Sequence, residues 1–418
     1  MDKAMSRKLN LHGMLLQFTF WFGFCTYLAF LIITLIDYGW SASAAAGAMT
    51  VMSVIMLVAQ PVYGFISDKY FSEKKLSVVL IVASAICLFL LPVSLGSGSN
   101  ALVWLNMTAI TLFGLPIGGL MDSWIVGLSQ EFPGVNYGIV RGMGSLAFAS
   151  SAQIAGMITY AFGHGARFTM GGVFVALSAI VALTFRATRK APPTGEENNA
   201  SNEATKLTGK EALKLVFSSK QYCLLLAVSF FLMLSMAAVG VLLQVLILDL
   251  DGTTAQIGTA TAVMAGSEVP VMFMTGFLLK KFGFKKLFVF ASLFYLVRLT
   301  LMATATSLGM LIVIQGLQGL SFAIILPVSM GYLSHIVDER VRTTAIAIFG
   351  AVTASLTGIL GNLITTTTLG LNFTAQNILL IFAGLASLGF VLAVYGAVRK
   401  IWDVEVAPAS VPMSKEAS

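Results

Sequence analysis

Charged residues are scarce in this sequence. Only 10% of its 418 residues are Asp, Glu, Lys or Arg, whereas 57% are hydrophobic and the mean hydropathy is +0.90. Because soluble domains carry about 25% charged residues, this composition excludes an ordinary soluble protein. The apolar residues gather in runs of about 20, the length of a helix that crosses a bilayer. We therefore predict an all-α membrane protein rather than a barrel.

Residues that build metal sites, disulfides and catalytic sites are equally sparse. The three cysteines, Cys25, Cys87 and Cys223, all fall within apolar runs, and the three histidines are scattered. Neither set has the spacing of a metal site or a disulfide framework. The phosphate-binding pattern G-x-x-x-x-G-K-[ST] is missing, as is any nucleophile motif in a loop. We expect no metal, no cofactor and no enzymatic activity.

Twelve apolar runs are long enough to cross a bilayer as helices. They cover residues 11–36, 42–67, 76–95, 101–127, 138–162, 168–187, 221–249, 256–279, 285–304, 308–333, 343–367 and 375–398. The longest polar break divides these runs six and six.

That break sets the predicted domain boundaries. We expect an N-terminal six-helix bundle over 1–187, a cytoplasmic linker over 188–219, a C-terminal six-helix bundle over 220–403 and a cytoplasmic tail over 404–418. The second half of the linker, KLTGKEALKLVFSSK, has helical spacing. It is predicted to lie along the inner membrane surface.

The basic residues indicate on which side of the membrane the termini lie. All but three of the 25 Lys and Arg residues lie at the termini or in breaks on the same side as the termini. Arg141 and Arg298 fall within spans, and Arg167 falls in a break on the other side. Cytoplasmic loops carry the excess of Lys and Arg, so both termini are predicted to be cytoplasmic. The net charge of +7 is then a topology signal and does not indicate nucleic-acid binding.

Two breaks at corresponding places in the halves resemble each other. GFISDKYFSEKK (64–75) follows the second span, and GFLLKKFGFKK (276–286) follows the eighth. Both begin with Gly-Phe at a helix end and finish on a basic pair. Many transporters consist of duplicated six-helix halves with a binding site between them. The repeat therefore predicts a carrier that binds a small molecule between its two halves.

The first break also resembles the signature of the major facilitator superfamily, which Gly64, Asp68, Lys74 and Lys75 carry here. Twelve spans, a central polar break and a second copy of the motif agree with this resemblance, which covers essentially the whole chain. It implies two pseudo-symmetric six-helix bundles that work by alternating access. It also implies that these four residues latch helix ends together in one access state. Simple anchoring at the inner surface is the alternative for the two lysines.

Four ionisable residues lie deep within the predicted spans: Asp122, Arg141, Glu268 and Arg298. A charge at the middle of a membrane helix costs about 2.5–3.5 kcal/mol on insertion scales, so each should face a cavity or an opposite charge. Asp122 and Arg141 lie at similar depth on helices joined by a short loop, and we expect them to meet. Glu268 and Arg298 both fall near the midplane.

A carboxylate that pairs with an arginine in one state and binds a proton in another can couple proton movement to substrate transport. A substrate that recruits Arg141 would free Asp122 to take up a proton. The alternative is a structural ion pair that only fixes helix packing. Glu268 and Arg298 are the further candidates for proton coupling.

The residues around these charges resemble the branch that holds lactose permease, phenylpropionate permease and the nucleoside–proton symporters. The pattern YGxxRxxGS (137–145) after Asp122, and the Ser-Glu pair at 267–268 before Arg298, carry this resemblance. It implies that Asp122 and Arg141 bind a sugar. It also implies that Phe148 takes the place of the aromatic platform on which the sugar stacks.

The tenth span departs from that branch. Gln315, Gln318 and Ser321 stand where lactose permease has Lys, His and Glu. Proton coupling, if present, must then lie with Asp122 or Glu268. Gln315 and Gln318 share a helix face, and they either bind hydroxyl groups of the substrate or link helices to one another.

Gln17 and Trp21, four residues apart on the first span, and Gln244 on the seventh are candidates to line the cavity. For Trp21, packing or an interfacial anchor is the favoured interpretation.

These observations predict a monomeric secondary transporter of the cytoplasmic (inner) membrane. Its predicted activity is uptake, with protons, of a small polar organic solute: first an oligosaccharide or glycoside, next a nucleoside or an aromatic acid. A multidrug exporter that works as a proton antiporter and a non-transporting membrane sensor are the alternatives. The pairing of Asp122 with Arg141 favours a polar or anionic substrate over a cationic drug.

Overall fold

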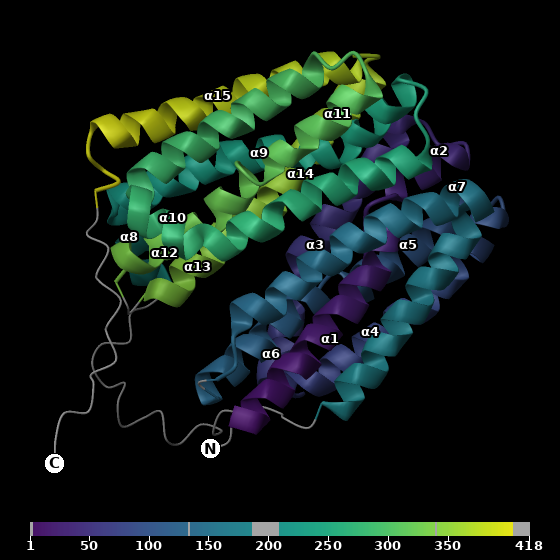
Figure 1. Cartoon of the computed structure of the whole chain (residues 1–418), viewed down its shortest axis with the longest axis horizontal. Coiled ribbons are helices and arrows are strands. Elements are labelled where there is room, and N and C mark those ends of the chain that lie inside the picture. The colour runs from purple at the N-terminus through teal and green to yellow at the C-terminus, as the bar shows by residue number, and fades with distance from the viewer. Residues whose placement is uncertain (1–2, 133, 186–208, 339–340, 404–418) are drawn as a thin grey trace.

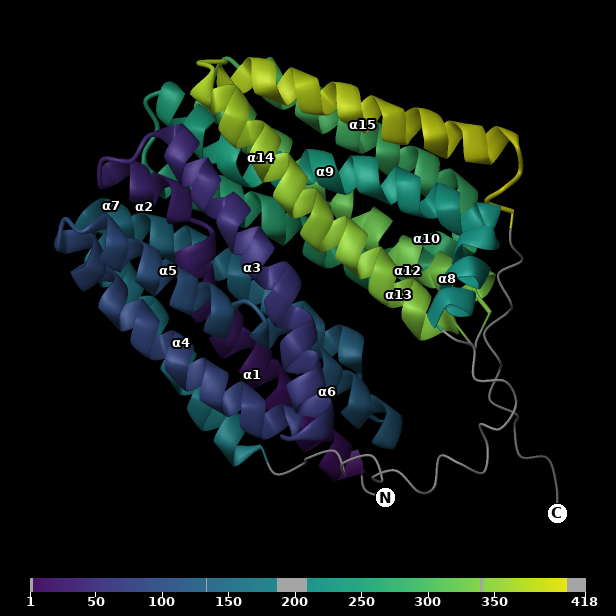
Figure 2. The ribbon, with the colours of Figure 1, turned by 180° about the vertical axis from the view of Figure 1, so that it is seen from behind.

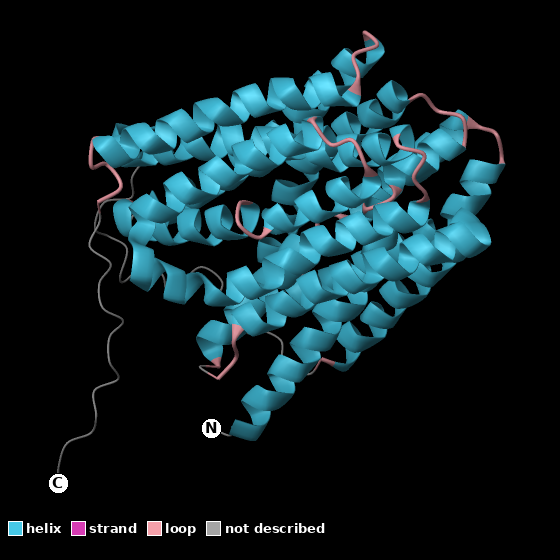
Figure 3. Cartoon of the chain, turned by 45° about the horizontal axis from the view of Figure 1, so that its top comes forward, coloured by secondary structure: helices cyan, strands magenta, loops and turns pink. Residues whose placement is uncertain are grey.

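The computed structural model describes residues 3–132, 134–185, 209–338 and 341–403. Within these ranges the chain is helical apart from short loops and contains no β-strand (Figure 3). This agrees with the all-α membrane fold that the composition predicts, since a helix satisfies every internal backbone group without water.

Seven helices form the N-terminal half: α1 (Lys3–Leu28), α2 (Leu31–Asp37), α3 (Ala42–Lys69), α4 (Glu73–Gly96), α5 (Asn100–Gly114), α6 (Ile117–Glu131) and α7 (Tyr137–Thr184). The C-terminal half contains α8 (Gly209–Ser218), α9 (Lys220–Asp249), α10 (Thr254–Ala303), α11 (Leu308–Ile314), the 3₁₀ turn η2 (Gln315–Gln318), α12 (Phe322–Ile336), α13 (Arg342–Gly350), the π-helical turn η4 (Ala351–Leu356), α14 (Thr357–Gly370) and α15 (Ala375–Val398).

Small polar residues begin many of these helices. Each of the following N-cap side chains accepts the backbone N–H three residues on: Ser41, Ser72, Ser99, Asn136, Ser219, Ser307 and Thr374. Such caps satisfy one of the backbone donors that a helix leaves unpaired at its start. They place the helix starts close to the predicted span boundaries.

Ten helical stretches of the described residues are long and apolar enough to cross a membrane. Two of them, Tyr137–Thr184 with 48 residues and Thr254–Ala303 with 50, would each be roughly 70 Å long if straight, more than twice the hydrocarbon thickness. Each contains one glycine with a non-helical backbone, Gly163 (φ 81°) and Gly283 (φ 72°). Glycine adopts positive φ because it has no Cβ. Both glycines fall in breaks between predicted runs.

The ribbon separates into two groups of helices, α1–α7 and α8–α15 (Figures 1 and 2). The groups diverge toward the end where α1 begins and α15 ends, which we call the terminal end (Figure 1). They approach each other at the opposite end, near α2 and α11 (Figure 1). Most of the predicted linker 188–219 and the tail 404–418 lie outside the described residues.

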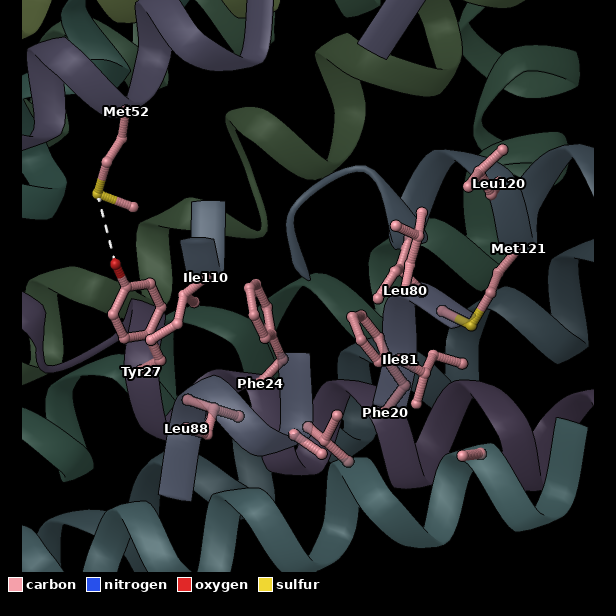
Figure 4. Packing of buried hydrophobic residues seen from close by; sticks show 14 of the residues in the cluster. Phe20, Phe24, Tyr27, Met52, Leu80, Ile81, Leu88, Ile110, Leu120 and Met121 are labelled. Carbon is pink, nitrogen blue, oxygen red and sulfur yellow. Dashed lines mark hydrogen bonds between the residues drawn. The ribbon is translucent and has the colours of Figure 1, made fainter. Parts of the chain in front are cut away.

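Each group has its own apolar core. In the N-terminal group, Phe20, Phe24 and Tyr27 of α1 pack beside Leu80 and Leu88 of α4 (Figure 4). A separate core in the C-terminal group lies between residues 212 and 402. Each group is thus packed internally.

A third cluster belongs to both groups, and we call it the shared cluster. It joins six N-terminal residues to residues of α9, α10, α11 and α15, among them Leu242, Leu246 and Ile257. The N-terminal members are Cys25, Ala29, Phe30, Ile33, Ala152 and Ala155. The shared cluster fills the space between the groups at the end far from the termini.

Close backbone contact accompanies the shared cluster. A Cβ on Gly156 of α7 would lie 2.6 Å from the Thr254 carbonyl oxygen and 2.9 Å from Gly258 Cα of α10. Nearby, the Ser43 hydroxyl donates to the Thr366 carbonyl at 2.9 Å, which links α3 to α14. The far end is therefore closed by dry packing and hydrogen bonds between the groups.

Candidate functional site

A cavity lies between the two groups on the terminal side of the shared cluster. It has a volume of about 670 Å³ and is lined by α6 and α7 on one side and by α10 and α12 on the other. Its polar lining comes from Asp122, Asn136, Tyr137, Arg141 and Ser145, and its apolar wall includes Phe273 and Met330. This volume is within the usual range for pockets that hold small organic molecules.

A second pocket of about 210 Å³ continues from the first, because both include Arg141 and Ser145. Trp21 of α1 and Phe148 of α7 line it on one side, and Glu268 of α10 lines it on the other. Phe148 lies ten residues beyond Gly138 on the same helix, about 15 Å farther from the terminal end. The smaller pocket is therefore the inner part of the site.

Asp122 and Arg141 meet, as the span depths predict. Arg141 Nε lies 3.5 Å from Asp122 Oδ2, and the side chains are 37% and 32% exposed, respectively. Charge-assisted hydrogen bonds are usually 2.7–2.9 Å long, so this pair is loose and open to the cavity. Both charges line the cavity.

Gln17 and Trp21 extend this pair into α1. The Trp21 indole N–H donates to Gln17 Oε1 at 2.9 Å, and Gln17 Nε2 donates to Asp122 Oδ1 at 3.1 Å. The Arg141 guanidinium lies 5.6 Å from the centre of the Trp21 ring, within cation–π range. Because Gln17 is fully buried, it orients the carboxylate rather than facing the cavity.

Trp21 extends the interpretation that the sequence favoured. It packs against the N-terminal core, as that interpretation holds, but its ring also lines the inner pocket and contacts the guanidinium. Two glycines make room for it: a Cβ on Gly144 would lie 2.7 Å from Trp21 Cδ1, and one on Gly118 would lie 2.9 Å from Trp21 Cζ2. The four-residue spacing from Gln17 was the sequence signal for this position.

Tyr137 is a residue that the sequence analysis did not select. It lines the cavity, and its hydroxyl interacts with the Asp122 carboxylate. Its place at the first position of α7, one turn before Arg141, was the available signal.

Glu268 and Arg298 are joined through a glutamine. Gln318 Nε2 donates to Glu268 Oε1 at 3.0 Å, and Gln318 Oε1 accepts from the Arg298 guanidinium. Gln315 Oε1 accepts from Arg298 Nη2 at 2.7 Å. Glu268 faces the inner pocket, whereas Arg298 is buried behind it.

The 3₁₀ turn η2 explains why both glutamines reach one guanidinium. It has three residues per turn, so side chains three apart project in the same direction. Gln315 and Gln318 are its first and last residues, and both are buried. Of the two roles considered for them, helix linkage is the one seen in this conformation.

The other predicted cavity residues lie in different places. Phe148 lines the inner pocket, and its ring centre lies 6.4 Å from that of Trp21. Gln244 instead lies at the far end, where its Oε1 accepts the Ile33 backbone N–H at 3.0 Å across the two groups. It lines neither the cavity nor the inner pocket.

The predicted latch is described in part. Lys74 Nζ donates to the carbonyl oxygens of Leu183, at 3.1 Å, and Phe185, at 2.5 Å, so it caps the end of α7. Lys75 is exposed, and Gly64 lines a small pocket between α3 and α6. The side chain of Asp68 lies outside what the structure describes. The latch role stays a prediction.

No group of three or more His, Cys, Asp or Glu side chains that could hold a metal occurs in the described part of the chain. The polar groups of the site suit hydrogen bonding to an organic solute, with acceptors on Asp122 and Glu268 and donors on Arg141.

The comparison with protein families agrees with this architecture. The family model described as "MFS_1 like family" matches residues 11–381. The chain belongs to the major facilitator superfamily. The two helical groups with a polar cavity between them are therefore those of a transporter of this superfamily.

Curated relatives of this facilitator are also transporters. Maltose permease of Geobacillus stearothermophilus is 27% identical over 319 residues, which cover 75% of each chain. The uncharacterized transporter YwbF of Bacillus subtilis (strain 168) is 25% identical over 235 residues, or 56% of this chain and 55% of YwbF.

Solved structures share the fold at low sequence identity. The nucleoside transporter NupG matches with a TM-score of 0.74 and 17% identity over 95% of this facilitator and 100% of NupG. A bacterial homologue of the human lysosomal transporter Spinster matches with a TM-score of 0.72 and 11% identity over 96% and 98% of the two chains. These likenesses concern the fold.

Proposed function

We propose that this facilitator takes up a small polar organic solute together with protons, by alternating access, with an oligosaccharide or glycoside as the first candidate. The observation that carries the proposal is the cavity between the groups, where a loose Asp122–Arg141 pair faces Glu268 beside two aromatic rings. A nucleoside or an aromatic acid is the next candidate. The candidate sugars, nucleosides and aromatic acids all combine polar groups with a flat or apolar ring.

The lining suits a sugar because it offers both kinds of contact that a sugar ring needs. Asp122 accepts hydroxyl hydrogen bonds, and Arg141 donates to hydroxyl or ring oxygens. Trp21 and Phe148 supply apolar ring faces for the C–H faces of the solute. Maltose permease, the relative that matches 75% of this chain, supports this choice.

Proton coupling is assigned to the two carboxylates that face the site. Asp122 is balanced directly by Arg141. When a bound solute engages Arg141, the carboxylate loses part of that balance and protonation becomes more favourable. Glu268 has a neutral amide as its hydrogen-bond partner, with Arg298 behind it, and is the second candidate.

Alternating access is assigned to movement of the two groups about this site. The far end is closed by the shared cluster and by hydrogen bonds between the groups. With cytoplasmic termini, which the basic residues predict, the conformation described here faces inward. We place the protein in the cytoplasmic membrane as a monomer.

Uptake by purified protein in lipid vesicles tests the proposal. Radiolabelled maltose accumulation should rise when the side that corresponds to the cell exterior is more acidic, and it should collapse with a protonophore. Uptake that responds neither to the pH gradient nor to the protonophore would indicate uniport rather than proton symport. Export of lipophilic cations driven by the same gradient, without sugar uptake, would favour a proton antiporter.

A further inference from the structure

Arg167 is the basic residue that the charge pattern leaves on the far side of the membrane. The structure buries it completely, on α7 just beyond the break at Gly163. Its Nη2 donates to the Thr34 hydroxyl at 2.5 Å, and its Nη1 donates to the Thr159 hydroxyl at 3.2 Å. Burial of a charge is expensive unless the surroundings compensate it. We therefore expect the buried charge of Arg167 to have a specific structural or functional role.

Aromatic rings supply part of the remaining compensation. The guanidinium lies 4.9 Å from the centre of the Phe30 ring and 4.4 Å from that of Phe168. Phe30 immediately precedes α2, and Thr34 lies on that helix. Arg167 thus contacts both the beginning and the middle of α2.

α2 is a separate seven-residue helix, because the chain leaves helical geometry at Phe30 (φ −129°, ψ 10°). A second contact fixes its other end to the same bundle: His164 Nε2 lies 2.7 Å from Asp37 Oδ2. The helix is therefore held to α7 at its start, middle and end.

The segment that contains Phe30 and α2 also contacts the other half of the protein. The Ile33 N–H donates to Gln244 Oε1 of α9 at 3.0 Å, and the side chains of Phe30 and Ile33 belong to the shared cluster. The contacts of Arg167 lie within one group, whereas the Ile33–Gln244 bond crosses between groups. A rigid movement of the groups preserves the first set and breaks the second.

We propose that α2 is the gate that closes the cavity at the far end, and that Arg167 is the positioning residue that holds α2 in its closing position. This inference rests on the proposed alternating access. Arg167 lines neither part of the substrate site, so it acts through α2. Its burial beneath that helix also explains why a basic residue is kept on the side where the others are excluded.

Cys25 provides a native reporter of this gate. It is fully buried, belongs to the shared cluster, and donates through Sγ to the Phe148 carbonyl at 3.4 Å. In purified protein with Cys87→Ser and Cys223→Ala, the rate of N-ethylmaleimide labelling of Cys25 measures how often the far end opens. We expect Arg167→Ala to label about tenfold faster than its parent, which corresponds to about 1.4 kcal/mol.

Two variants sharpen this labelling experiment. Arg167→Lys keeps the charge and N–H donors on a single nitrogen, so it should restore most of the protection. Arg399→Ala removes an exposed arginine after α15 and should label at the parent rate. Equal labelling of Arg167→Ala and its parent would overturn the proposal.

A distance measurement separates gating from general loosening. Spin labels at Phe71→Cys and Lys280→Cys, both exposed at the terminal ends of the two groups, report how far apart those ends lie. In a background without native cysteines, Arg167→Ala and Gln244→Leu should each increase the population with a shorter distance, because opening the far end closes the terminal end.

An unchanged distance distribution together with a lower unfolding temperature would show that Arg167 is only structural, and would refute the gate. Both measurements use protein without substrate. A negative result therefore rejects the role of Arg167 and leaves the transport proposal to be decided by the uptake assay.

Discussion

Gly144 gives the sharpest test of the substrate site, because it is the point where three site residues converge. A Cβ at this position would lie 2.7 Å from Trp21 Cδ1, 3.1 Å from Arg141 Nη1 and 3.2 Å from Gln17 Oε1. The first of these distances is shorter than a carbon–carbon contact allows. Gly144→Ala must therefore displace the indole ring, and with it the hydrogen bond from Trp21 to Gln17.

The magnitude follows from two opposing terms. Overpacking costs about 1–3 kcal/mol, whereas replacing glycine by alanine within a helix gains about 1 kcal/mol. Gly384→Ala on α15 is the matched control, since nothing lies within 4 Å of its Cβ. It should gain the helical term alone, so the two variants should differ by about 1–3 kcal/mol in free energy of unfolding.

Substrate affinity should fall more steeply than stability. Misplacing Gln17 and Arg141 weakens hydrogen bonds to charged groups, each worth about 1.5–3 kcal/mol, so Kd should rise about tenfold to a hundredfold. Thermal unfolding of purified protein with increasing maltose, and then with the best ligand of a sugar and nucleoside screen, measures both quantities. If Gly144→Ala bound the ligand as tightly as Gly384→Ala, the inner pocket would not be the binding site.

The remaining predictions concern charges at or near the site. Arg141→Ala should abolish binding of that ligand in the thermal-shift assay, and unchanged affinity would reject the assignment of Arg141. Asp122→Asn should keep counterflow exchange in vesicles while losing uphill accumulation; if accumulation survives and Glu268→Gln removes it, Glu268 is the coupling group. Lys74→Met should lower stability by about 1–2 kcal/mol, because the end of α7 loses a partly exposed charged cap. Its neighbour Lys75→Met should unfold at the temperature of the unmodified protein, and equal losses would contradict the capping role.

Local features of the chain were enough to predict the position of the charged pair. Asp122 and Arg141 lie on helices joined by a short loop, so a rise of about 1.5 Å per residue places them at the same depth. The structure brings them within 3.5 Å. Gly163 and Gly283 likewise fall in the breaks between predicted runs, where the long helices turn.

Partners from distant parts of the chain were not predictable in this way. The residues Gln17 and Asp122 meet across 105 positions, and Ile33 meets Gln244 across 211. Which face of a membrane helix contacts which neighbour depends on rotation and tilt, and these are set by packing against other helices. The link from Arg298 through Gln318 to Glu268 was missed for this reason.

Hydropathy, the distribution of basic residues and the two related loops determined that this protein is a two-part membrane carrier, because the bilayer imposes length and charge rules that each segment obeys separately. Only the tertiary structure decided which charges face the cavity and which lie behind it. Glu268 and Arg298 have similar predicted depth, yet one lines the pocket and the other is buried. Burial of Arg167 beneath α2 was likewise decided by side chains that meet only after the helices have packed.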